Sequence, residues 1–122
     1  MAKLSARGRK EIARVTREWT AEERDGWGED RPMVTVRHKR EYAFMSDGKV
    51  LRKDTAYLPK DKYGSSRNFT GGWHEFKRLR TDDPLVERNA KMLELAKILL
   101  AHIQQQIREG KPGTVTMTTG GK

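Results

Sequence analysis

The chain has 122 residues, with 34% hydrophobic and 35% charged side chains and a formal net charge of +9. This length fits one domain, and the lack of cysteine excludes disulfides, thiol catalysis and Cys-ligated zinc. No apolar run approaches the roughly 18 residues of a membrane span, and no signal-peptide core follows Met1, so we expect a cytoplasmic protein without a membrane partner.

The positive charge is concentrated in two parts of the chain. Residues 1–20 carry a net charge of +4 and residues 33–80 carry +7, whereas residues 21–32 carry −3 and residues 81–122 carry +1. This uneven distribution indicates different roles for the two ends of the chain.

Residues 5–19 predict an amphipathic helix. Ser5 can act as its N-cap, and Ile12, Val15 and Trp19 fall on one face at 100° per residue. The basic residues of the segment recur on the opposite face and are Arg7, Lys10, Arg14 and Arg17. Residues 21–32 contain glycine, proline and mixed charge, which indicate a loop.

Residues 33–58 predict a β-hairpin, because apolar and polar residues alternate along its first half. Asp47-Gly48 favours a two-residue type I′ turn. In that register Phe44 pairs with Leu51, and Glu41 lies opposite Asp54, an unfavourable pair of like charges. A different loop length would remove this clash, so the hairpin is predicted and its register stays open.

A third strand is predicted from Phe69 to Leu79, with a bulge or bend at Gly71-Gly72. Pro59 ends the preceding strand because proline cannot donate to a ladder. Residues 60–68 then form an exposed loop.

Residues 84–109 predict a long helix. Asp82 and Asp83 supply an acidic N-cap, Pro84 fits the first helical position, and Gly110 ends the helix. Its apolar residues form two stripes, so we expect the second stripe to pack on the N-terminal helix or on another subunit. The residues assigned to this partner or homodimer face are Leu85, Met92, Leu95 and Leu99.

These elements predict a single α+β domain over residues 1–111. It comprises an N-terminal helix, a three-stranded antiparallel β-meander and a long C-terminal helix. The Gly- and Thr-rich tail, residues 112–122, is expected to be flexible or to form a short edge strand.

No arrangement of residues predicts an enzyme, a cofactor or a metal site. His38, His74 and His102 share no metal-ligand spacing. His74 and Glu75 are adjacent on a strand and therefore point to opposite faces. Capping at a helix start accounts for the carboxylates before Pro84.

Basic residues interleaved with aromatic ones predict a nucleic-acid-binding protein whose contacts are mainly electrostatic and independent of sequence. The candidate binding residues are Arg7, Lys10, Arg14, Arg17, Arg37, Lys39, Arg40, Arg52, Lys53, Lys60, Lys62 and Arg67. The candidate stacking residues are Tyr57, Tyr63 and Trp73. Phe69 and Phe76 would add to this surface if exposed, although Phe76 and Trp73 also suit a core.

Residues 4–15 (LSARGRKEIARV) and 45–53 (MSDGKVLRK) resemble stretches of small uncharacterised bacteriophage proteins. The resemblance implies a short accessory protein of a phage or mobile element, acting in the cytoplasm of its bacterial host, and carries over no site residue. It keeps a second hypothesis open, a protein-binding inhibitor of a host nucleic-acid-processing or defence complex, similar to anti-CRISPR proteins. A third hypothesis is a structural component of a virion or scaffold.

Overall fold

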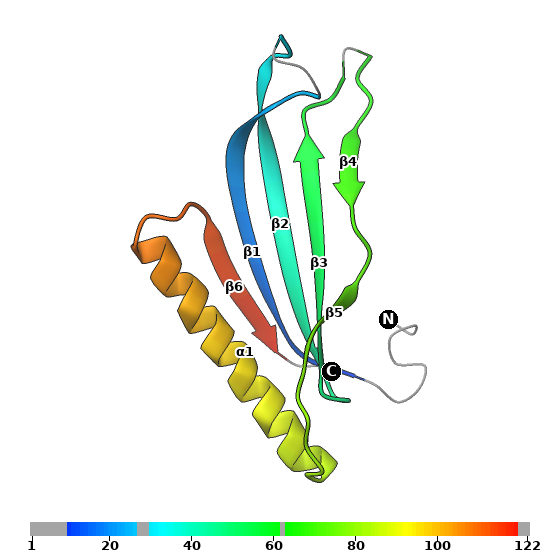
Figure 1. Ribbon diagram of the computed structural model, residues 1–122, viewed down its shortest axis with the longest axis vertical. Helices are drawn as coiled ribbons and strands as arrows, with labels where there is room; N and C mark the ends of the chain where they lie inside the picture. Colours follow the sequence, from blue (N-terminus) through cyan, green and yellow to red (C-terminus); the bar gives the residue numbers. More distant parts are fainter. Residues whose placement is uncertain (1–9, 27–29, 62, 120–122) are drawn as a thin grey trace.

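A computed structural model describes residues 10–26, 30–61 and 63–119. Along this part of the chain the elements are β1 (Glu11–Arg24), β2 (Met33–Met45), β3 (Lys49–Leu58), β4 (Arg67–Thr70), β5 (His74–Arg78), α1 (Leu85–Arg108) and β6 (Thr114–Thr119). The strands form one six-stranded sheet in the order β4-β3-β2-β1-β6, and β5 also pairs with β3 (Figure 1). All the pairings are antiparallel.

Helix α1 packs on one face of the sheet, over β6, β1 and β2. We call this side the helix face and the other side the open face. The core on the helix face contains Ala13, Val15, Tyr42, Phe44, Val50, Met92, Ala96 and Ile103. A smaller cluster on the open face packs Ala43, Met45 and Leu51 against Trp73. The strands extend well beyond the helix, so part of the helix face stays uncovered (Figure 1).

The N-terminal helix predicted over residues 5–19 is wrong, because the described part of this segment is strand β1. Val15 and Trp19 share a helical face, but they also share strand parity, so both periodicities fit them. Tertiary pairing favours the strand over the helix, because β1 forms a long ladder with β2 and a second ladder with β6. Ser5 lies outside the described residues.

The hairpin of β2 and β3 is confirmed, but its register differs by one residue from the predicted one. Phe44 pairs with Val50, because the loop is one residue longer than predicted. The Gly48 amide donates to the Met45 carbonyl at 3.0 Å, and Gly48 follows this turn with φ of +93°. Such a three-residue loop places a glycine at the positive-φ position.

The register found in the structure replaces the predicted like-charge clash with opposite charges. Arg40 lies opposite Asp54, and Glu41 lies opposite Lys53. The Asp54 carboxylate accepts hydrogen bonds from Arg40 at 2.6 Å and from Arg52 at 3.0 Å. Burial raises the pKa of Asp54, but these hydrogen bonds outweigh it and hold the pKa below its usual value.

The predicted three-stranded meander is also wrong, because the sheet has six strands. The third strand is divided into β4 and β5, which pair with different halves of β3 on either side of Gly71-Gly72. The bend predicted at these glycines thus becomes a break in the edge of the sheet.

The long C-terminal helix is confirmed over Leu85–Arg108, and Gly110 follows its end with φ of +116°. Residues 114–119 of the predicted tail form strand β6, which pairs with β1. Gly113 makes this return to the sheet possible. It has φ of +112°, and a Cβ at this position would lie 2.4 Å from the Glu18 carbonyl oxygen.

We expect Gly113→Ala to lower the free energy of unfolding by roughly 2 kcal/mol or more, because it combines an unfavourable φ with a backbone clash. Gly72→Ala is the matched control, since a Cβ there meets no atom within 4 Å. Urea denaturation of both variants measures the difference. Equal stability of the two variants would contradict this placement of β6 against β1.

We expect Asp54→Asn to reduce the dependence of stability on acid pH. The depressed pKa means that the ionised carboxylate stabilises the fold above the unfolded pKa of 3.8, and that this contribution is lost as pH falls through the folded pKa. The stability gap between parent and variant should therefore be largest at neutral pH, at most about 1 kcal/mol for a partly exposed pair, and should close by about pH 2. Thermal unfolding across this pH range measures it, with Asp82→Asn at an exposed position as the control. A gap that widens in acid would contradict the prediction.

Candidate nucleic-acid interface

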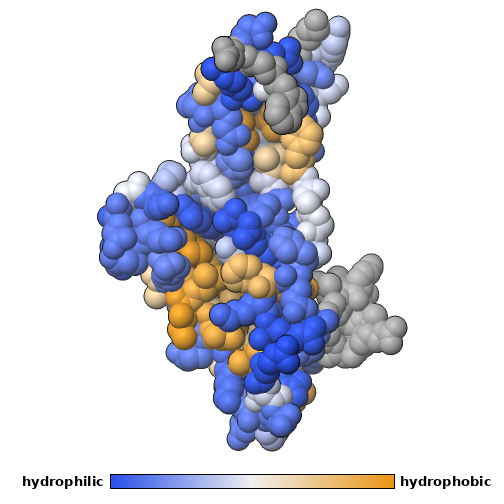
Figure 2. Space-filling view, in the orientation of Figure 1, coloured by the Kyte–Doolittle hydropathy of each residue, from blue (hydrophilic) through white to orange (hydrophobic). Residues whose placement is uncertain are grey.

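Basic side chains gather along β3 and β5 at one edge of the sheet. They are Lys49, Arg52, Lys53, Lys77, Arg78 and Arg80, and we call this set the basic edge. Register brings them together, because Lys49 pairs with Arg78 and Val50 with Lys77. Every residue of β5 is exposed. Figure 2 shows hydrophilic surface at the lower right, over β5, beside an apolar groove.

Most of the basic edge is not neutralised by carboxylates. Within the described residues, Lys49, Lys53, Lys77 and Arg80 make no ion pair. Arg52 shares Asp54 with Arg40, and Arg78 pairs with Glu75 at 2.9 Å. Charged side chains on an edge strand discourage pairing with other chains. Four cations without ion pairs on adjoining segments also create a local positive potential that attracts anions.

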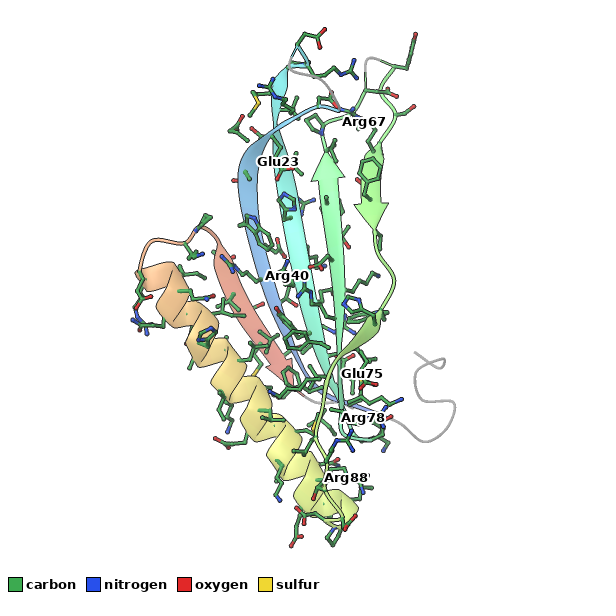
Figure 3. The ribbon with its side chains drawn as sticks, in the orientation of Figure 1. Glu23, Arg40, Arg67, Glu75, Arg78 and Arg88 are labelled. Carbon is green, nitrogen blue, oxygen red and sulfur yellow. The ribbon has the colours of Figure 1, made fainter. Side chains whose placement is uncertain are left out.

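Glu75 of β5 is a carboxylate that lies among the cations of the basic edge. Figure 3 shows Glu75 and Arg78 close together on β5. The side-chain hydrogen bond from Arg78 lowers the pKa of Glu75, and the charges of Lys49 and Arg80 lower it further. Glu75 therefore stays ionised at neutral pH and fixes the position of Arg78 without cancelling the surrounding charge.

Aromatic side chains flank the basic edge on both faces of the sheet. On the helix face, Phe69 of β4 is 63% exposed and Phe76 of β5 is 46% exposed. Phe76 makes an edge-on contact with Tyr42, with ring centroids 5.2 Å apart. On the open face, the half-buried ring of Trp73 lies 5.1 Å from the Arg14 guanidinium carbon and 5.7 Å from Lys53 Nζ.

Most other predicted binding residues lie away from the basic edge and are engaged within the sheet. Arg14 and Arg17 lie on opposite faces of β1, so the predicted cationic helix face does not exist. Arg14 pairs with Glu11 at 2.6 Å and with Glu41 at 3.0 Å. Its pKa is raised, chiefly by the hydrogen bond to Glu11. Arg17 donates to the Pro112 carbonyl at 3.1 Å.

The remaining predicted cations either form ion pairs or are exposed outside the strands, and the backbone of Lys10 is hydrogen-bonded to Ser46 at the β2–β3 turn. Arg37 pairs with Glu18, Lys39 with Glu41 and Arg67 with Asp25. Lys60 is exposed after β3, and Lys10 is exposed just before β1. Arg7 and Lys62 lie outside the described residues. Of the predicted set, only Arg52 and Lys53 belong to the basic edge.

The predicted stacking residues occupy three different settings. The Arg37 guanidinium covers the Tyr57 ring at 4.2 Å. Tyr63 is 80% exposed in the loop between β3 and β4. Trp73 alone lies beside the basic edge.

Lys49, Lys77, Arg78 and Arg80 are site residues that sequence reasoning missed. Residues 74–80 (HEFKRLR) are visibly basic, and all of them except Arg80 belong to the strand predicted from Phe69 to Leu79. A last strand in a small sheet lies at an edge, where its side chains are exposed. Combining the local charge with that position would have identified the cluster.

The predicted partner face on the helix does not form a continuous surface. Met92 is fully buried in the core, and Leu85 is exposed in the first turn. Leu95 and Leu99 line an apolar groove of about 360 Å³ between α1 and β5, together with Phe44 and Phe76. Figure 2 shows apolar surface, in orange, over this part of the helix and beside it.

Within residues 10–26, 30–61 and 63–119, no group of three or more His, Asp or Glu side chains is arranged to hold a metal ion. No helix in the same ranges combines the length and the apolar character needed to cross a membrane.

No protein-family model matches the chain, and no curated protein or solved structure matches it either.

Proposed function

We propose that this protein binds nucleic acid through the basic edge, by electrostatic contacts that do not read sequence. The observation that carries the proposal is the set of four cations without ion pairs, Lys49, Lys53, Lys77 and Arg80, on strands β3 and β5 and just beyond β5. Cations that contact a phosphate backbone release its condensed counterions into solution, and this release supplies most of the affinity of sequence-independent binding.

The exposed aromatic rings favour a single-stranded ligand over a duplex. Phe69 and Phe76 lie on the helix face of the same edge and are 63% and 46% exposed. Unpaired bases can stack on exposed aromatic rings of this kind. A duplex keeps its bases stacked inside and would contact only the cations. The edge offers no recognition helix, so groove reading is not part of the proposal.

A protein-binding role, as an inhibitor of a host nucleic-acid-processing complex, makes a different use of the same cations. An acidic patch on a protein would engage the lysines and leave the aromatic rings without bases to stack on. Binding assays with isolated oligonucleotides therefore distinguish the two roles.

We expect the triple variant Lys49→Gln, Lys53→Gln and Lys77→Gln to bind a single-stranded oligonucleotide at least tenfold more weakly at about 0.1 M salt. The slope of log K against log salt should fall by about 2 in magnitude, since each lost phosphate contact removes about 0.7. Fluorescence anisotropy over a salt series measures both quantities.

The matched control for this variant removes the same charge from Lys97, Arg108 and Lys111, which are exposed at and after the second half of α1 and make no ion pair among the described residues. This control should bind like the parent. Equal losses in the two triple variants would mean that net charge alone, and not the basic edge, drives binding. No binding by the parent at low salt would overturn the proposal.

We expect Phe69→Leu to weaken single-strand binding by about tenfold, because one base loses its aromatic stacking partner. The salt slope should not change, since no cation is removed. Phe69→Tyr keeps the π face and should restore the parental affinity. If Phe69→Leu binds single and double strands as tightly as the parent, the ligand contacts the cations without stacking.

A further inference from the structure

Strand β6 forms the second edge of the sheet. Within the described ranges, β6 pairs only with β1 and stands at the end of the strand order. An edge strand carries a row of backbone N–H and C=O groups that face away from its one partner. Over Thr114–Thr119, no other strand of the described residues pairs with this row.

The side chains of β6 do not protect its edge, although α1 packs against the strand on one face. Its sequence, Thr-Val-Thr-Met-Thr-Thr, contains no charge and no proline, and it consists mainly of residues that favour strands. The opposite edge is protected, because β5 carries Glu75, Lys77 and Arg78, and β4 carries Arg67. The two edges of one sheet are therefore built differently.

We propose that β6 is a dimerisation strand, pairing antiparallel with β6 of a second copy of this chain. The absence of charge on β6 permits a second copy to approach at this place. Two chains of net charge +9 repel each other, and a strand of six uncharged residues lets them approach without placing like charges in the ladder.

Symmetry restricts the register of such a pair. A two-fold axis between identical antiparallel strands places one residue opposite its own copy. An axis at Thr116 pairs threonine with threonine on one face of the sheet and apolar residues with apolar residues on the other. Thr114 then lies opposite the partner's Thr118, and Val115 lies opposite the partner's Met117. Val115 and Met117 already pack against the core on the helix face, so this register extends that apolar surface across the axis. The threonines form cross-strand pairs on the open face.

The dimer would join two sheets into one and leave the basic edges at its two ends. It would also place both α1 helices on the same face of the joined sheet, because a two-fold axis perpendicular to a sheet preserves its faces. The inference does not rest on the nucleic-acid proposal, since β6 and the basic edge lie on opposite edges of the sheet.

Sedimentation equilibrium of the unmodified chain is the first test, because it needs no variant to fold. We expect a dimer at micromolar concentration. Thr116→Lys should shift the mass to that of a single chain, because it places two ammonium groups opposite each other across the axis. Thr70→Lys makes the same change on exposed β4, at the opposite edge, and should remain dimeric.

Cysteine cross-linking tests the register, since the chain contains no cysteine of its own. Thr116→Cys should form an intermolecular disulfide on mild oxidation, because directly opposed Cα atoms lie about 5 Å apart. Thr118→Cys on the same face should cross-link at least tenfold more slowly, because the two copies of residue 118 would lie about 14 Å apart. A mixture of Thr114→Cys and Thr118→Cys chains should form the mixed disulfide.

Two results would overturn the proposal. One is a monomeric mass for the parent at all concentrations up to about 100 μM. The other is equal cross-linking rates at residues 116 and 118, which would indicate random collision or another interface. Nucleic-acid binding by a monomeric parent would leave the basic edge in place and reject the β6 dimer alone.

Discussion

The antiparallel pairing of β1 with β2 is the interaction on which the rest of this molecule depends. The two strands pair along almost their whole length, from Ala13 opposite Phe44 to Arg24 opposite Met33. One end of the ladder presents small and aromatic side chains to Met92 and Ala96 of α1, which forms the main core. The other end extends beyond the helix. A single hairpin therefore supports both a buried core and an uncovered sheet surface.

The half of the β1–β2 ladder that extends beyond the helix is stabilised by contacts among polar and aromatic side chains. Arginine side chains take part in these contacts. Trp19 stacks on His38 with ring centroids 5.0 Å apart, and Arg17 and Arg40 lie over the same indole at 5.0 and 5.5 Å. His38 Nε2 in turn lies 2.6 Å from Glu23. A basic side chain is therefore engaged within the sheet when a carboxylate or an aromatic ring lies beside it on the neighbouring strand. Only basic side chains without such a neighbour are available to a ligand. A one-residue shift in register changes every such pair, so the sequence shows where basic residues are and not which of them are unpaired.

The elements that could be predicted are those determined by local signals. The helix has a regular periodicity and two marked ends, and the β2–β3 hairpin has alternation and a turn dipeptide; both are present. The N-terminal segment lacks a decisive local signal, because Val15 and Trp19 satisfy a helical stripe and a strand face equally well. Its conformation is settled by ladders with β2 and β6, which are distant in sequence. Residues 114–119 are strand for the same reason, since their partner β1 lies about 100 residues earlier.

The two edges of the sheet explain why the uneven charge along the chain matters. The basic middle of the sequence supplies β3 and β5, and the nearly neutral C-terminal part supplies β6. Because β3 and β6 lie on opposite sides of the β1–β2 hairpin, a contrast along the sequence becomes a contrast across the sheet. A strand edge rich in lysine and arginine repels a second copy and attracts anions, whereas an uncharged edge of threonine and valine permits backbone pairing. The fold thereby separates, on one small sheet, a surface suited to a phosphate backbone from a surface suited to another strand.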